Sequence, residues 1–286
     1  MFFPNKIRML TALLGASAIM SVAASPVQAD ESPFSSLYLA EVLPKGALEL
    51  EQWATWKWHR PQERYYRLQG RTELEYGVSD RFQVALYASY SRTKIVPNGP
   101  GAPGSPENSF LFDGISGEAI YQVLNPYTAP VGLALYFEPS IGRGTRALEF
   151  KALLQKNLLE DRLILAANLN LEYEWERDAG VWEHGSALEF YLGASYRFAP
   201  GWFGGLEFLN ENAYSGHILS GASAQTSAFY FGPTLHYASQ GWWATLAFLP
   251  QLPIAGNPGG GAGAVSHGYV TEEERMRMRL RIGVQL

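Results

Sequence analysis

The feature that most constrains this chain is an alternation of apolar and polar residues with a period of two, which recurs along almost its whole length. The segments 65–78, 163–176 and 275–286 show the alternation most clearly. In the second of them every other position from Leu163 to Trp175 is apolar. Because successive side chains of a β-strand point to opposite faces, each segment is predicted to be a strand with one apolar and one polar face.

Weaker versions of the same pattern fill the rest of the chain and predict about twelve strands. Most are longer than the roughly 5–6 residues typical of globular strands, and they reach the roughly 9–11 residues that a tilted strand needs to cross a membrane. The sequence therefore predicts an all-β fold, a single antiparallel transmembrane β-barrel. The expected strands are 47–58, 65–78, 82–96, 111–124, 131–141, 146–157, 163–176, 186–198, 202–210, 226–238, 242–249 and 272–286.

The last range also has a helical interpretation, because Glu, Arg, Met and Leu are good helix formers. A helix would spread its four alternating arginines, from Arg275 to Arg281, around all sides. The strict alternation up to the chain end favours a strand instead.

The connections between these strands alternate in length, and this is the layout of outer-membrane barrels, with short turns on the periplasmic rim and long loops outside. The segments 59–64 and 142–145 are exceptions, since they are short where long loops are expected. The expected short turns are 79–81, 125–130, 158–161, 199–201 and 239–241, and the expected long loops are 97–110, 177–185, 211–225 and 250–271.

The N-terminal residues have the pattern of a secretory leader. Two basic residues precede an apolar stretch, and Val27 and Ala29 place small side chains at the positions that define cleavage. We therefore expect residues 1–29 to be a cleaved signal peptide and residues 30–286 to form the barrel domain. The sequence contains no cysteine, so disulfides cannot contribute to its stability.

Composition agrees with a lipid-embedded barrel. Aromatic residues make up 14% of the chain, and the formal net charge of −5 argues against a general nucleic-acid binder. After the leader there is no run of about 18 apolar residues that could form a membrane-spanning helix. A soluble β-sandwich is the alternative, but it would have to bury every outward Leu and Tyr within one chain. We expect outer-membrane lipid, including lipopolysaccharide, and the barrel-assembly machinery as partners.

The charged residues of the polar faces are predicted to line the lumen and form its binding site. In a barrel of twelve strands, 163–176 lies across from the first and last strands, so an acidic wall faces a mostly basic one. Such a field could orient and select small solutes, or the charges could pair and close a narrow lumen. The predicted lumenal residues are Arg67, Arg71, Glu73, Glu75, Glu172, Glu174, Glu176, Arg275, Arg277, Arg279 and Arg281.

Three segments resemble a known family of bacterial outer-membrane proteins. These are Leu43–Gly46 before a strand that carries Glu49 and Glu51, the strand–turn–strand unit 74–82, and the segment VGLALYFEPSI at 131–141. They resemble the barrels of the phenol meta-pathway family and related barrels. The resemblance implies a role in the uptake of small molecules and supplies no catalytic residues.

The motifs of enzymes and metal sites are weak. Of the five histidines, only His236 falls within a predicted strand, on its polar face. His217 and His267 have serines nearby but no GxSxG motif, and Glu183-His184 lacks the spacing of a metal-binding pair. We therefore predict no catalytic residues, metal or cofactor. The leading function is a narrow channel or passive transporter. The alternatives are a non-conducting barrel that binds through its outer loops and, third, a lipid-modifying enzyme.

Overall fold

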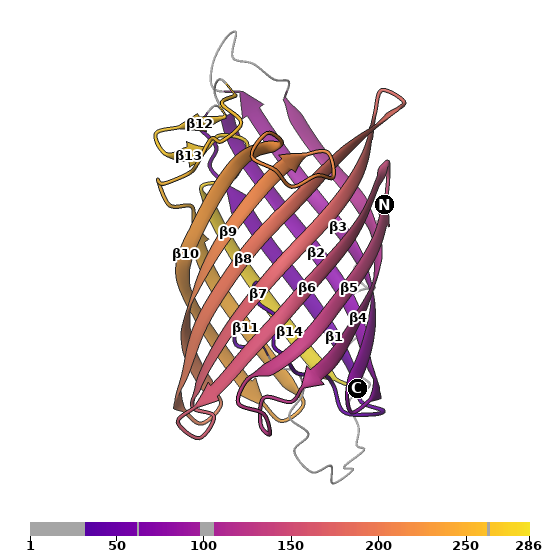
Figure 1. Cartoon of the computed structure of the whole chain (residues 1–286), viewed down its shortest axis with the longest axis vertical. Coiled ribbons are helices and arrows are strands. Elements are labelled where there is room, and N and C mark those ends of the chain that lie inside the picture. The colour runs from indigo at the N-terminus through magenta and orange to yellow at the C-terminus, as the bar shows by residue number, and fades with distance from the viewer. Residues whose placement is uncertain (1–31, 62, 98–105, 262–263) are drawn as a thin grey trace, which may run out of the picture.

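The computed structural model describes residues 32–61, 63–97, 106–261 and 264–286, and these form a closed β-barrel with a segment of the chain inside it (Figure 1). Twelve antiparallel strands make the wall, and each pairs with its neighbours in chain order. The first and last wall strands pair directly from Glu49 with Gln285 to Trp58 with Met276, which closes the barrel. The predicted leader, 1–29, lies outside the described residues.

All twelve predicted strands are present, although several ends differ. The predicted segment 186–198 begins earlier, at Val181, and the predicted segment 272–286 becomes a strand only at Met276. Two further short strands, β12 (Val265–Ser266) and β13 (Tyr269–Val270), form a separate hairpin. The wall strands are β1 (Leu48–Trp58), β2 (Glu63–Ser79), β3 (Phe82–Pro97), β4 (Glu107–Leu124), β5 (Gly132–Gly142), β6 (Thr145–Leu158), β7 (Leu163–Asp178), β8 (Val181–Ala199), β9 (Trp202–Ser215), β10 (Ala224–Ser239), β11 (Trp242–Pro250) and β14 (Met276–Gln285).

The alternation predicted from the sequence separates an outer face from an inner one. Leu74, Leu169 and Val284 are each more than two-fifths exposed, whereas Glu73, Asn168 and Arg281 beside or near them are buried. An exposed apolar belt around a buried polar interior is the arrangement of a barrel in lipid. No helix in the described ranges is long and apolar enough to cross a membrane.

The two rims of the barrel differ as the outer-membrane layout requires. The rim at the chain end carries the short turns, and by this layout it faces the periplasm. The opposite, extracellular rim carries the connection from β11 to β14, which contains β12 and β13 (upper end of Figure 1). The prediction of a long loop over 177–185 is wrong, because β7 ends at Asp178 and β8 begins at Val181. Ala179 and Gly180 both have positive φ, 45° and 90°, and so form a tight hairpin turn that lets β7 and β8 run on to it.

A segment before β1 lies inside the barrel, which the alternation did not predict. We call residues 32–43 the lumenal segment. Phe34, Leu37, Ala40 and Leu43 in it have no exposed surface. The chain therefore fills part of its own lumen before it enters the wall.

The outer face gives a first testable prediction. Leu169 lies near the middle of β7 and is 44% exposed, so Leu169→Arg should lower the free energy of unfolding from a bilayer by about 2–4 kcal/mol. Val181, at the extracellular end of β8, is 66% exposed, and Val181→Arg should cost only about 0–1 kcal/mol. Denaturant titration in vesicles measures both values. Equal costs at the two positions would contradict a lipid-facing Leu169.

Candidate functional site

The lumenal segment is held by wall side chains that bond to its backbone. The Tyr38 amide donates to Asn168 Oδ1 at 2.8 Å, and Asn168 Nδ2 donates back to the Tyr38 carbonyl at 2.9 Å. The Ala40 amide donates to Gln155 Oε1 at 2.9 Å, while Gln122 Nε2 donates to the Ala40 carbonyl at 2.8 Å. Because buried backbone groups need partners, these inward amides replace the neighbouring strand that an extended segment would otherwise require.

Charged wall residues hold the first part of the segment in the same way. Glu207, which is fully buried, accepts hydrogen bonds from the amides of Ser35 and Ser36. Arg281 Nη1 donates to the Phe34 carbonyl at 3.3 Å, and Arg279 Nη1 donates to the Ser35 carbonyl at 3.1 Å. Two of the predicted lumenal arginines therefore bind the chain's own backbone.

Apolar contacts also hold the lumenal segment against the wall. Phe34, Leu37 and Leu39 pack in a buried cluster with wall residues that include Leu209 and Leu249. A second cluster joins Tyr38 and Ala40 to Trp53, Ile120 and Leu153. The sequence did contain one signal of an internal segment. Leucines and an isoleucine occupy inward positions of the strands where the alternation predicts polar residues.

A glycine in the wall makes room for the segment. A Cβ atom at Gly193 would lie 2.5 Å from Cε1 of the Phe34 ring, which is closer than carbon atoms approach. The Phe34 ring therefore occupies the space that a side chain on β8 would fill.

The segment forms a floor across the periplasmic half of the lumen. Its wall partners come from strands all around the barrel, and those that bond to Tyr38 and Ala40, which are Asn168, Gln155 and Gln122, each lie in the half of their strand next to the periplasmic rim. Glu41, at the edge of this floor, accepts a hydrogen bond from the Tyr127 hydroxyl at 3.1 Å. Burial raises the pKa of the Glu41 carboxyl, and the hydrogen bonds from Gln155 and Tyr127 oppose that rise.

Several predicted lumenal residues are paired locally. Arg281 contacts Glu51 across the β1–β14 pair, with 3.1 Å between Nη2 and Oε2. Arg71 contacts Glu73 at 2.8 Å and Glu118 at 3.3 Å. Since a buried charge without a partner is costly, these pairs keep most of the basic wall neutralised by its own neighbours.

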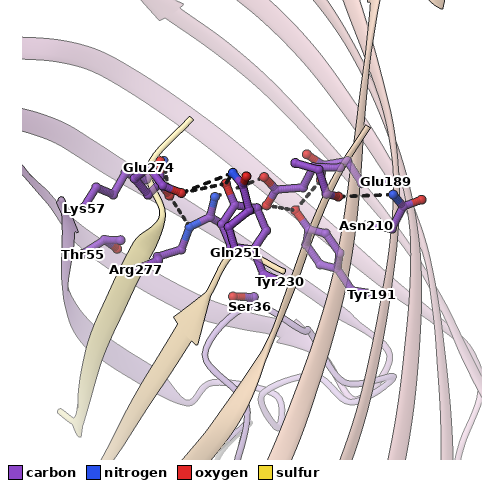
Figure 2. A network of polar contacts seen from close by, with 12 residues as sticks. Ser36, Thr55, Lys57, Glu189, Tyr191, Asn210, Tyr230, Gln251, Glu274 and Arg277 are labelled. Atoms are coloured by element: carbon purple, nitrogen blue, oxygen red, sulfur yellow. Dashed lines mark hydrogen bonds and ion pairs between the residues drawn. The ribbon is translucent and has the colours of Figure 1, made fainter. Parts of the chain in front are cut away.

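Arg277 and Lys57 follow the same rule near the extracellular side of the floor (Figure 2). Arg277 pairs with Glu211 across the lumen at 2.7 Å and with Glu274 at 2.6 Å. Lys57 lies 3.4 Å from Glu274. Burial alone would raise the pKa of Glu274, but Arg277 and Lys57 outweigh it and bring that pKa down to about 2.

Three further residues of the predicted lumenal set belong to β2 or to the segment before β14. They are Arg67, Glu75 and Arg275. Arg67 lies 3.9 Å from Asp113, and Glu75 accepts a hydrogen bond from Gln83 Nε2 at 3.1 Å. Arg275, predicted on the lumenal face of the last strand, lies just before β14 at the extracellular rim. Its strand placement was therefore wrong, because pairing with β11 starts only at Met276.

The acidic wall is present on β7, halfway around the barrel from β1. Glu172 and Glu174 are half-buried and Glu176 is exposed at the rim. In the described ranges none of the three forms an ion pair with Lys or Arg. Beside them, Glu189 accepts a hydrogen bond from the Tyr191 hydroxyl at 2.6 Å. The acidic and basic walls therefore face each other without contact between the two predicted charge runs.

A cavity of about 370 Å³ lies above the floor. Ser36 and Tyr38 of the lumenal segment belong to its lining. Its remaining lining is mixed, with aromatic rings between opposite charges. The charged residues of this chamber are Arg71, Asp113, Glu138, Glu149, Lys151, Glu189 and Arg279.

Carboxylates also gather near the base of the lumen. Oxygens of Glu49, Glu51 and Glu75 lie within 4.8 Å of one another, as do those of Glu73, Glu75 and Glu118. The antiparallel register places Glu49 opposite Glu75 and Glu51 opposite Glu73, a pairing that the strand order alone does not give. Carboxylate oxygens are ligands for hard cations, although two arginines already lie beside these groups.

The histidines offer no catalytic arrangement among the described residues. His236 lies on the inner face of β10, as predicted, and its Nδ1 is 2.7 Å from the Thr245 hydroxyl. That hydroxyl donates to the Ser32 carbonyl at 3.0 Å, so His236 supports the floor indirectly. His184 also lies in a strand, β8, where only His236 was expected.

The closed wall, the apolar belt and the floored polar lumen together define the outer-membrane β-barrel class of protein. The chain belongs to the family of unknown function DUF6662, whose model matches residues 26–286. The family suggested by the resemblance is therefore confirmed only at the level of an outer-membrane barrel. No curated protein matches this sequence.

Solved structures share the fold. The COG4313 outer membrane channel from Pseudomonas putida F1 is 13% identical, with a TM-score of 0.61 over 86% of this chain and 98% of that one. The β-domain of the Bordetella autotransporter BrkA is 8% identical, with a TM-score of 0.52 over 85% of this chain and 100% of that one. At these identities the likeness establishes the barrel fold.

The seat of the lumenal segment can be tested with a single thiol, because the chain has no cysteine. Leu37→Cys should react slowly with a water-soluble thiol reagent, since Leu37 is fully buried. Adding Asn168→Ala removes two hydrogen bonds to Tyr38 and should raise the labelling rate about tenfold. Asn212→Ala is the control, because Asn212 bonds to the wall carbonyl of Leu188. Fast labelling of Leu37→Cys in the parent background would contradict the floor.

Proposed function

We propose that this barrel is a narrow, passive channel for small polar solutes, with a preference for cations. The observation that carries the proposal is the polar chamber above a floor that wall side chains, rather than strand pairing, hold in place. Side-chain hydrogen bonds contribute about 0.5–1.5 kcal/mol each, so such a floor can shift without opening the wall. The P. putida structure of the same fold is described as a channel, which agrees with this proposal.

The preference for cations follows from which charged residues of the lumen form ion pairs and which do not. Most lumenal arginines are neutralised by adjacent carboxylates, such as Glu51 for Arg281 and Glu118 for Arg71. Glu172 and Glu174 on β7 have no such cation partner within the described ranges. A lumen with low-dielectric walls concentrates the counter-ions of its unpaired charges. The acidic side should therefore attract the cationic part of a solute, while the aromatic rings of the chamber contact its apolar part.

The proposal leaves no catalytic role for the barrel. His236, the histidine on the lumenal face, is bonded to Thr245 and contributes to the support of the floor. Replacing His236, His217 and His267 together should leave any lipid turnover by the protein unchanged. Loss of such turnover would favour a lipid-modifying enzyme.

Removal of the floor should increase conduction. Deleting 33–43 takes away the residues that seal the lumen but leaves every wall strand, so the single-channel conductance in a planar bilayer should rise well above that of the parent chain. A deletion of 217–222, in the connection between β9 and β10, is the matched control and should leave the conductance unchanged. If neither the parent chain nor the floor deletion conducts at any voltage, the barrel is a non-conducting, binding or structural protein.

Selectivity should depend on the acidic wall. Glu172→Gln with Glu189→Gln removes two negative charges from the lumen, and the ratio of cation to anion permeability, taken from reversal potentials in a salt gradient, should fall several-fold. Glu160→Gln with Glu183→Gln removes the same charge from exposed turn and rim positions and should change the ratio little. An unchanged ratio in the lumenal variant would show that another part of the pore sets selectivity.

A further inference from the structure

Two adjoining hollows lie at the extracellular rim, outside the chamber. The larger, about 630 Å³, lies where β1 ends, β2 begins and the chain enters β14, and the smaller, about 250 Å³, lies over β2 and β3. Both are lined by Arg64 and Tyr65. We call the two hollows together the rim trough.

The rim trough is strongly basic in a chain whose formal net charge is −5. Its lining includes four cationic side chains, Arg60, Arg64, Lys94 and Arg275, and a single carboxylate, Glu63. That carboxylate is already paired with Arg60 at 3.1 Å. This excess of cationic over carboxylate side chains differs from the lumen, where nearly every arginine lies beside an acidic residue.

Three of these cations have no hydrogen-bond acceptor among the described residues. In the part of the chain that the structure describes, no carboxylate, carbonyl or hydroxyl bonds to the side chains of Arg64, Lys94 or Arg275. The guanidinium of Arg275 lies over the Tyr269 ring, with 4.1 Å between its Cζ and the ring centroid. This cation–π contact restrains the guanidinium and leaves its N–H donors available to a planar or tetrahedral anion.

The backbone around the larger hollow is strained yet fixed. His59 and His267, which both line it, have φ values of 70° and 51°, a conformation that non-glycine residues rarely adopt. The Arg275 amide donates to the His59 carbonyl at 2.9 Å, and the His59 amide donates to the Tyr65 carbonyl at 3.2 Å. Strain that neighbouring elements hold in place is frequent where a ligand is bound.

The height of the rim trough on the barrel points to the source of the anion. Trp58 borders the larger hollow and stacks on Phe248 of the outer face, with 6.2 Å between ring centroids. Tyr66 borders the smaller hollow and is 41% exposed. Aromatic rings of this kind mark the boundary between lipid and water, so the cations lie at the level of the lipid head groups.

We propose that the rim trough binds phosphate groups, with Arg64, Lys94 and Arg275 as the ligating side chains. Phosphate combines negative charge with several acceptor oxygens, which suits three cationic donors, one of which, the buried Nε of Arg275, has no hydrogen-bond partner among the described residues. The same chemistry is offered by the phosphates of lipopolysaccharide in the outer leaflet and by a free phosphorylated solute that approaches the mouth. The outward position of Arg64 and Lys94 favours the lipid.

The test uses the full mature chain folded in detergent micelles, with binding measured for lipid A that carries its phosphates and for the same lipid after enzymatic dephosphorylation. The parent chain should bind the phosphorylated form at least tenfold more tightly, and Arg64→Gln with Lys94→Gln and Arg275→Gln should abolish that difference. The control variant is Lys45→Gln with Arg81→Gln and Arg162→Gln, which removes the same charge from the periplasmic rim and should bind like the parent. Mobility on unheated gels verifies that each variant is folded.

A second arm separates the two sources of phosphate. If excess inorganic phosphate displaces the lipid, or binds the parent but not the trough variant, the phosphate site is supported and free phosphorylated solutes are ligands as well. Equal binding of both lipid forms by the parent, or equal binding by the parent and the trough variant, would overturn the proposal. The conductance of Arg64→Gln with Lys94→Gln, which changes only exposed residues outside the lumen, should match that of the parent, so failure here is distinguishable from failure of the channel proposal.

Discussion

The pairing of β1 with β14 is the interaction on which the rest of the structure depends. A lipid-embedded sheet cannot leave backbone donors and acceptors unpaired at an edge, because no water reaches them there. The continuous register from Glu49 with Gln285 to Trp58 with Met276 removes both edges at once. Closure also creates an interior, and it brings Arg281 of β14 beside Glu51 of β1, where the two charges neutralise each other.

Backbone groups inside the barrel also need hydrogen-bond partners. The lumenal segment runs through a partly dehydrated space with its backbone exposed to the wall, so its amides and carbonyls need partners. The wall supplies them through side chains, with Asn168 acting on Tyr38 in the way that a neighbouring strand would. The polar inner face is thus in part a set of hydrogen-bonding positions for this segment, in addition to being the lining of a path for solutes.

The strands of the wall could be predicted from the sequence, but the segment that lies inside the barrel could not. Alternation reports which way a side chain faces, so Leu169 and Val284 could be placed outside and Glu172 and Arg281 inside. It cannot report what an inward side chain meets, because that depends on residues far away in the chain. Phe34 against Gly193 and Glu207 against Ser35 are contacts of this kind. Inward Leu153 and Leu209, which break the polar pattern, are the clue that could have indicated an occupied lumen. The hairpin at Ala179 was missed because its turn relies on backbone conformation rather than on residue pattern.

The bond between the Thr245 hydroxyl and the Ser32 carbonyl joins residues 213 positions apart in the chain. Long-range contacts of this kind form late, since the entropy of closing the intervening loop is lost before the contact is gained. Because Thr245 belongs to β11, we expect the lumenal segment to reach its final place only after β11 has joined the wall. The interior of this barrel would then be filled last, by a segment that precedes every strand of the wall in the chain.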